Sequence, residues 1–131
     1  MFTPITVVGK IVHADGAAAS GGLRFQLSEP VVGGGWQPAG MLDSATGQFV
    51  SPDPVQGVIF DGQLLRPPSG GGPYTPLVLY ANDDPTTTPV GTVYVVTEQL
   101  TAGGIPPWPL TLSHTAAGGT VNLSAQRPVP A

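Results

Sequence analysis

The two histidines, His13 and His114, are the bases that the sequence offers for catalysis near neutral pH. A hydrolytic site needs a nucleophile, a base and an orienting group brought together. His114 directly follows Ser113, but neighbouring residues on a strand point to opposite faces, so these two cannot form a nucleophile–base pair. His13 ends a predicted strand near Asp15, where a turn-stabilising contact is typical. The histidines therefore predict hydrogen bonding at loop edges, and we predict no catalytic residue and no enzymatic activity.

Neighbouring carboxylates occur at Asp83 and Asp84, directly after Asn82, and such hard oxygen ligands on a loop suit calcium. A calcium loop alternates acidic residues over many positions and has a glycine at its bend, whereas Pro-Thr-Thr-Thr-Pro follows here. Asx-type turn contacts that hold the loop are therefore favoured over a metal site. Asp43 and Glu98 are too isolated to be assigned as an acid and a base. We predict neither a metal nor a cofactor.

Aromatic residues offer another chemistry, because exposed rings on one face can stack on sugar rings. The candidates are Trp36, Tyr74, Tyr80, Tyr94 and Trp108. Trp36 and Trp108 lie among loops and prolines, where each could be a surface anchor or a core residue. We take Trp36, Tyr74 and Trp108 as the candidate interaction residues, and the sequence alone does not place them on a common face.

The composition predicts the elements that must position these residues. Glycine and proline exceed a quarter of the 131 residues, 40% are hydrophobic and only 9% are charged. So few charges cannot cover the exposed faces of amphipathic helices, while the hydrophobic fraction is enough to bury a core. No sustained Gly-X-Y repeat indicates collagen. Glycine and proline must then form turns between short strands, and the length predicts one domain over residues 1–131.

The clearest predicted strands are 76–82 and 92–99, which are dense in β-branched and aromatic residues. Alternation and apolar density predict further strands, at 5–13, 23–28, near 41–42, 48–51, 55–60, 63–66, 108–113 and 120–124. Pro52 and Pro54 interrupt this series because proline cannot donate a ladder hydrogen bond. About seven to nine short strands at such spacing predict an all-β fold, a single antiparallel β-sandwich with little or no helix.

Four segments are predicted to lie outside the strands. Residues 30–38, with three consecutive glycines, predict an irregular loop anchored by Trp36. Residues 67–73 predict a long exposed loop, because the chain on either side is too short for two separate cores. Residues 1–4 and 126–131 are predicted as extended arms.

Charge and cysteine content exclude several classes of partner. The net charge is −4 and four scattered basic residues form no positive stripe, so we expect no nucleic acid partner. No apolar run approaches the roughly 18 residues that span a bilayer, so we expect no membrane partner. The N-terminus has no basic segment followed by an apolar stretch, so we expect no secretion signal. Without cysteine there is no disulfide framework and no thiolate zinc site.

Three motifs resemble the transthyretin-like and carboxypeptidase-regulatory-like β-sandwiches. They are G-x-I-x-x-x-D-G at 9–16, G-x-x-F at 22–25 and D-x-x-x-G-x-F at 43–49. In those domains a glycine-bearing strand runs into Asp-Gly and returns as an apolar strand, and a later glycine releases the chain into a short strand. The resemblance implies a transthyretin-like or immunoglobulin-like sandwich.

Residues 79–100 and 118–129 are similar to segments of minor tail proteins from bacteriophages of actinobacteria, most specifically at 81–85 and in G-T-x-Y-x-V at 91–96. The resemblance implies a structural virion protein, a minor tail or baseplate component located in the virion. Its partners would be other virion proteins, tail or capsid subunits, in a homo-oligomer such as a trimer. The alternatives are a capsid decoration protein and a module that binds a host cell-surface glycan.

Overall fold

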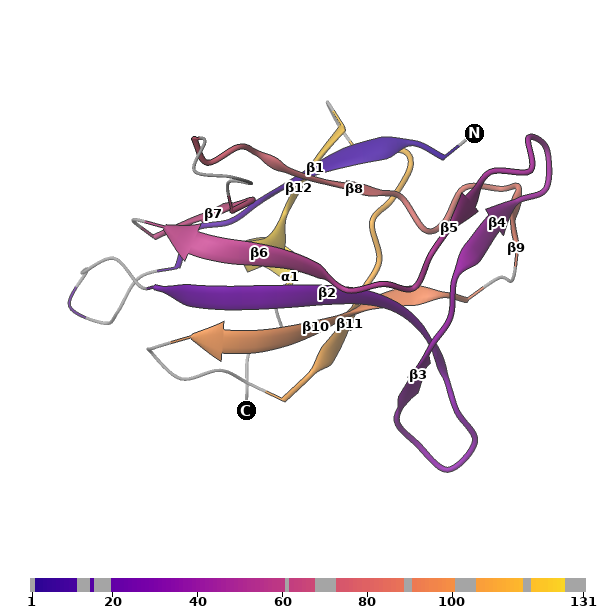
Figure 1. Ribbon diagram of the computed structural model, residues 1–131, viewed down its shortest axis with the longest axis horizontal. Helices are drawn as coiled ribbons and strands as arrows, with labels where there is room; N and C mark the ends of the chain where they lie inside the picture. Colours follow the sequence, from indigo (N-terminus) through magenta and orange to yellow (C-terminus); the bar gives the residue numbers. More distant parts are fainter. Residues whose placement is uncertain are drawn as a thin grey trace.

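The computed structural model describes residues 2–11, 15, 20–60, 62–67, 73–88, 91–100, 106–116 and 119–126. These residues form twelve strands and one short helix, α1 (Leu123–Gln126) (Figure 1). The prediction of an all-β fold with almost no helix is confirmed. Of the predicted features, His13, the loop interior 68–72 and the chain after Gln126 lie outside the described residues.

A small sheet has the strand order β12-β1-β8. Strand β1 (Pro4–Val8) pairs antiparallel with β8 (Leu77–Tyr80) and parallel with β12 (Thr120–Asn122). Ile5 and Val7 of β1 are buried, as the alternation in the sequence predicts for a sheet with one face on the core. Strand β8 is an edge of this sheet, and its second side pairs with no other described strand.

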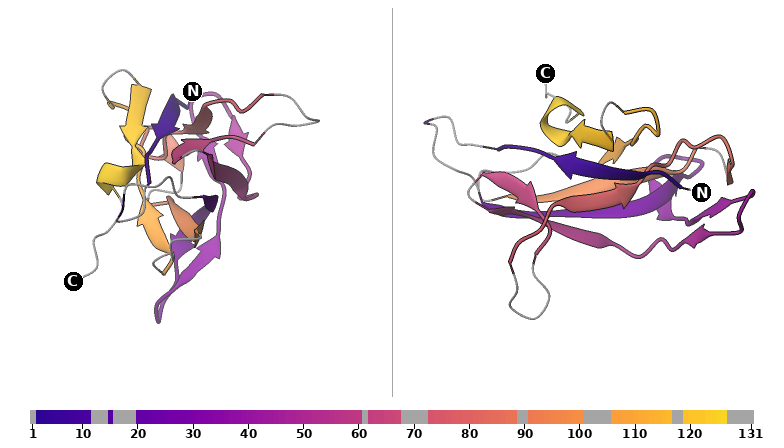
Figure 2. Two further views of the ribbon diagram at one scale, coloured as in Figure 1. Left: turned by 90° about the vertical axis from the view of Figure 1, so that its left-hand side faces the viewer. Right: turned by 90° about the horizontal axis from the view of Figure 1, so that it is seen from above.

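A large sheet has the order β11-β10-β2-β6-β7, with β3 paired to the far end of β2. Its strands are β2 (Gly21–Pro30), β3 (Trp36–Pro38), β6 (Val55–Phe60), β7 (Gln63–Leu65), β10 (Val93–Leu100) and β11 (Trp108–Leu110). Leu23, Phe25 and Leu27 of β2 are buried, whereas Arg24 between them is exposed. The small sheet lies across the buried face of the large one, so the core is between the two layers (Figure 2).

A third, minor sheet caps one end with β4 (Met41–Asp43), β5 (Phe49–Val50) and β9 (Thr87–Thr88). The turn between β4 and β5 depends on Asp43, whose carboxylate accepts hydrogen bonds from the Ala45 N–H (3.0 Å) and the Thr46 hydroxyl (2.9 Å). Gly47 leaves this turn with a φ of +77°, a conformation that favours glycine. The turn predicted from the D-x-x-x-G-x-F motif is therefore present.

The two main layers are joined at one corner by the chain that follows β1. The Leu64 N–H of β7 donates to the Gly9 carbonyl (3.0 Å), and the Ile11 N–H donates to the Gly62 carbonyl (2.8 Å). These bonds extend the large sheet past β7 onto the chain of β1. On the opposite flank, no described residue bridges the backbones of β8 and β6, so the layers stay open there.

The architecture differs from the predicted single antiparallel sandwich. Twelve strands are described instead of seven to nine. Strand β3 lies in the segment predicted as a loop, and β9 has two residues and is too short for alternation to reveal it. The parallel pairing of β1 with β12 and the separate minor sheet are further differences. Parallel pairing joins segments far apart in the chain, and local sequence patterns contain no signal for it.

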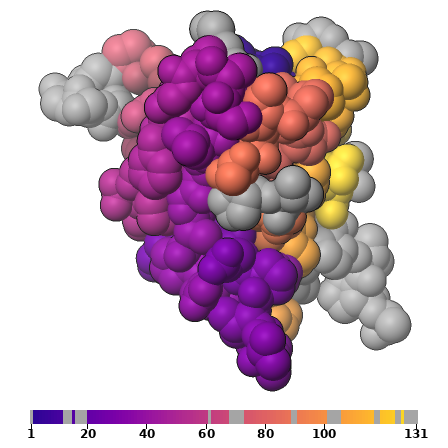
Figure 3. Space-filling view, turned by 90° about the vertical axis from the view of Figure 1, so that its right-hand side faces the viewer, coloured from indigo at the N-terminus to yellow at the C-terminus, as the bar shows by residue number. Residues whose placement is uncertain are grey.

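Two segment predictions need correction. Residues 30–38 form a projecting β-hairpin rather than an irregular loop, since β2 continues to Pro30 and β3 returns from Trp36 (Figure 3). The three glycines between them all have positive φ, which allows the reversal. Residues 2–4 are not an arm: Phe2 is 1% exposed and the Thr3 carbonyl accepts the Ala81 N–H at 2.7 Å.

Gly21 is the position where the fold tolerates a side chain least. A Cβ there would lie 2.3 Å from the Gln99 carbonyl oxygen of β10, and φ is +137°. Gly21→Ala should lower the free energy of unfolding by about 3 kcal/mol. Gly33→Ala, at a φ of +94° with open space around the added Cβ, is the matched control and should cost about 1 kcal/mol. Urea unfolding of both variants measures the difference, and equal losses would contradict the close β2–β10 approach.

Candidate functional site: a groove beside strand β8

An open groove of about 410 Å³ runs along the free edge of β8. Its apolar lining includes Leu27, Leu79 and Tyr94, and Val50 and Val55 contribute on the side of the β5–β6 chain. The volume is within the range of ordinary ligand sites, which are mostly apolar with a few polar groups. The groove is therefore a recess at which the described residues could hold a partner.

The groove exists because the chain before β6 cannot form a strand against β8. Pro52 and Pro54 have no N–H, so the segment leading to Val55 cannot donate a continuous ladder of hydrogen bonds. The Gln26 side chain donates to the Pro52 carbonyl (3.1 Å) and holds this segment on the large sheet. Strand β7 pairs only with residues 58–60 of β6. The first half of β6 and the edge of β8 consequently remain apart.

The register of β8 shows which of its backbone groups face the groove. The Ala81 N–H donates to the Thr3 carbonyl, so Ala81 and every second residue before it direct their backbone groups toward β1. Val78 and Tyr80 are in the opposite phase, and their N–H and C=O groups face away from β1. The Asn82 N–H is in that same phase, and it donates to the Leu112 carbonyl (3.3 Å) rather than to β1.

One hydrogen bond crosses the groove from the large sheet. The hydroxyl of Tyr94 on β10 donates to the outward Tyr80 carbonyl at 2.7 Å. Tyr94 is 3% exposed, and burial raises its pKa far above the usual range, so the hydroxyl stays protonated and remains a donor. Within the described residues, the Val78 N–H, the Val78 C=O and the Tyr80 N–H have no partner.

Strand β8 also lacks the features that usually protect an edge. Its sequence, Leu-Val-Leu-Tyr, contains neither proline nor charge. By contrast, the edge strand β11 contains Pro109 and the projecting β3 contains Pro38. The exposed side chains of β8 are apolar or aromatic, with Val78 45% and Tyr80 37% exposed. An apolar edge of this kind is prone to pairing with another chain.

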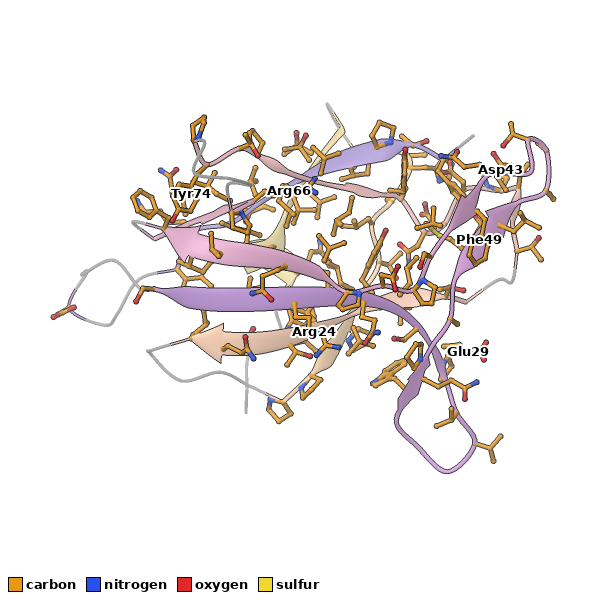
Figure 4. All side chains as sticks on the ribbon, in the orientation of Figure 1. Arg24, Glu29, Asp43, Phe49, Arg66 and Tyr74 are labelled. Atoms are coloured by element: carbon orange, nitrogen blue, oxygen red, sulfur yellow. The ribbon has the colours of Figure 1, made fainter. Side chains whose placement is uncertain are left out.

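Two charged side chains lie at the groove. Arg66 lies between the ribbons of β6 and β8 in Figure 4, and its backbone pairs with Thr75 just before β8. Its guanidinium makes no hydrogen bond or ion pair with any described residue. Asp53 lies on the β6 side, where its carboxylate accepts a hydrogen bond from the Ser51 hydroxyl (2.8 Å). The groove thus has a cation without a described partner near the start of β8 and a carboxylate just before β6.

The three aromatic residues predicted as interaction residues do not come together. Trp108 is 4% exposed, and its indole N–H donates to the Glu98 carboxylate (3.1 Å), which fits the core alternative. Trp36 is 39% exposed on the projecting β3. Tyr74 is 42% exposed and stacks on Phe60, with ring centroids 4.6 Å apart (Figure 4). The groove brings together two other members of the original set, Tyr80 and Tyr94, whose pairing no local pattern revealed.

The polar segment after β8 is structural in the described chain. The Asn82 amide donates to the Thr92 carbonyl (2.6 Å), and its oxygen accepts the Leu112 N–H (2.8 Å). The Asp84 carboxylate accepts bonds from both the N–H (3.0 Å) and the hydroxyl (3.1 Å) of Thr3. These side chains hold the loop, as predicted, but through distant segments rather than local Asx contacts. The described residues contain no cluster of three or more potential metal ligands.

His114 is held by Asp83. One Asp83 oxygen accepts the His114 N–H (2.7 Å) and lies 2.9 Å from the ring nitrogen Nδ1. The prediction of loop-edge hydrogen bonding for His114 is confirmed. Partial burial opposes ionisation of Asp83, but the hydrogen bonds and charge of His114 outweigh it, so the pKa of Asp83 lies below its usual range.

No family model, curated protein or solved structure matches the chain. In the part of the chain that the structure describes, no helix has the length and apolarity needed to cross a membrane.

The ionised form of Asp83 should stabilise the fold above the carboxyl's unfolded pKa and lose this effect as pH falls through the lower folded pKa. Asp83→Asn should cost about 0.5 kcal/mol at pH 7, since the pair is about one-third exposed and screened by solvent. The cost should vanish toward pH 2. Urea unfolding over this pH range measures it, and a cost independent of pH would contradict the ionic contribution.

Removal of the Tyr94 hydroxyl should leave the Tyr80 carbonyl without its donor. Tyr94→Phe should lower the free energy of unfolding by about 1 kcal/mol. Tyr74→Phe removes an exposed hydroxyl and should be neutral, which makes it the matched control. Thermal or urea unfolding compares them, and a neutral Tyr94→Phe would show that the bond across the groove contributes nothing to stability.

Proposed function

We propose that this chain is a structural bacteriophage virion protein, a minor tail or baseplate component, that assembles with other virion subunits through the edge of β8. The observation that carries the proposal is the unprotected edge of β8 beside an apolar groove. Isolated proteins usually block such an edge with proline, charge or a covering segment. A neighbouring subunit would provide that cover in an assembly.

The phage assignment is supported by the residues that build the groove. The segment interpreted as similar to minor tail proteins, residues 79–100, contributes Leu79, Tyr80 and Tyr94 to the lining of the groove. The low charge of the chain also suits burial of surface against neighbours. A homo-oligomer, a trimer among the alternatives, and a decoration protein on the capsid would use the same edge.

A non-catalytic role agrees with how the polar groups are used. The imidazole of His114 is engaged by Asp83, and the Ser113 hydroxyl lies 2.8 Å from that of Thr115. Each of these groups is therefore committed to a local contact. Among the described residues we identify no nucleophile, base and orienting group that converge on a common point.

A host cell-surface glycan is the second candidate ligand, and one specific observation favours it. Phe60 and Tyr74 stack at an interplanar angle of 20°, and they are 53% and 42% exposed. Exposed rings of this kind can stack on the apolar face of a sugar. Because each ring covers one face of the other, only the outer faces would be free for a sugar. Saturable binding to peptidoglycan that Tyr74→Ala abolishes would support this candidate.

The assembly proposal predicts that a charge on the β8 edge blocks docking. Val78→Lys should leave the fold intact because Val78 is 45% exposed, but it should weaken binding to purified phage particles that lack this protein by about tenfold or more. Val8→Lys, at a position 39% exposed on β1, is the matched control and should bind as the unmodified chain does. Cosedimentation measures both affinities.

Two outcomes would contradict this proposal. The unmodified protein could fail to bind particles while it binds peptidoglycan, which would favour the glycan candidate. Alternatively, Val78→Lys could bind particles as tightly as Val8→Lys, which would exclude the β8 edge as the docking site.

A further inference from the structure

We propose that the groove takes an extended strand of a partner subunit, which pairs antiparallel with β8 and places an acidic side chain against Arg66. This inference rests on the proposed assembly function and specifies the chemistry of the partner. Three features of the groove support it: unpaired backbone groups, an apolar floor and an asymmetric pair of charges.

The unpaired backbone groups indicate that the occupant of the groove is a polypeptide. Val78 presents both an N–H and a C=O to the groove, and Tyr80 presents an N–H, all in one phase of the strand. We call the bound partner strand the guest. In an antiparallel ladder, one residue of the guest would form hydrogen bonds with both the N–H and the C=O of Val78. The guest residue opposite Tyr80 would accept its N–H and could share the Tyr80 carbonyl with the Tyr94 hydroxyl. Donors and acceptors that alternate with this spacing are a property of an extended backbone.

The apolar floor of the groove favours a guest strand with apolar side chains. Residues opposite each other in a sheet direct their side chains to the same face. A guest residue opposite Leu79 would therefore direct its side chain as Leu79 does, toward the core side of the groove, which Leu27 and Tyr94 also line. A β-branched apolar residue fits that position best, because it has high strand propensity and no polar group to desolvate.

The two charged side chains, Arg66 and Asp53, favour one order of charged residues along the guest strand. Arg66 is next to Thr75, before the start of β8, and Asp53 lies just before the start of β6. An antiparallel guest has its C-terminal part beside the start of β8. An acidic residue in that part would neutralise the otherwise unpaired guanidinium, and a basic residue in the N-terminal part would face Asp53. A guest with the reverse order of charges would be disfavoured at both ends.

Synthetic peptides can test the occupant without a known partner. The probe is acetyl-Lys-Thr-Val-Ile-Val-Thr-Glu-amide, titrated into the ¹⁵N-labelled full chain. We expect saturable binding, with the amide signals of Val78 and Tyr80 shifted and newly protected from hydrogen exchange. A peptide with Lys and Glu exchanged should bind about tenfold more weakly.

N-methylation separates strand pairing from general apolar binding. Methyl groups on alternate amides should weaken binding about tenfold or more when they face β8, and should have little effect in the other phase. Arg66→Glu should reverse the preference between the two charge orders. Arg24→Glu changes an exposed arginine on the outer face of β2 and should leave the preference unchanged, so it is the matched control (Figure 4).

Each failure has its own meaning. Absence of peptide binding, or equal effects of methylation in both phases, overturns the extended-strand occupant. If the peptides fail while Val78→Lys still prevents binding to particles, the assembly function stands and only the occupant is wrong. If the peptides bind at β8 but the chain binds no particle, the strand site stands and the virion assignment is wrong.

Discussion

The backbone of β8 sets the main constraint on this molecule, because the N–H and C=O groups of Val78 and Tyr80 depend on what lies across the groove for their hydrogen bonds. The Tyr94 hydroxyl satisfies the Tyr80 carbonyl, and the neighbouring Val78 groups are left to solvent in the isolated chain. Water can satisfy them at little cost, so the fold does not require a partner. In the proposed assembly, the same groups would form directional hydrogen bonds with a partner that excludes that water.

The polar segment after β8 holds this edge in place. Asn82 ties the end of the strand to Thr92 and Leu112, and Asp84 ties it to Thr3 near the N-terminus. These contacts hold the end of β8 in place in the isolated chain. A prearranged edge loses less conformational entropy on binding than a mobile one, which favours affinity. In the proposed assembly, the acidic motif would thus contribute to docking through rigidity rather than through ligand coordination.

The sequence predicts much of the fold but little of the site. Density of β-branched and aromatic residues located β8 and β10, and strict alternation located the buried face of β2. Pro52 and Pro54 also signalled a break in the ladder. Which edge that break leaves open depends on pairings between segments far apart in the chain, such as β1 with β8, and no local pattern contains them. Trp108 illustrates the same limit, since its burial depends on β10 and on contacts with Glu98.

Amide hydrogen exchange of the isolated chain tests the central claim most directly, because it measures each backbone N–H of β8 separately. We expect slow exchange at Leu77 and Leu79, which pair with β1, and fast exchange at Val78 and Tyr80, which face the groove. Slow exchange at Val78 and Tyr80 in the free monomer would contradict it, since the edge would then already be covered within the chain.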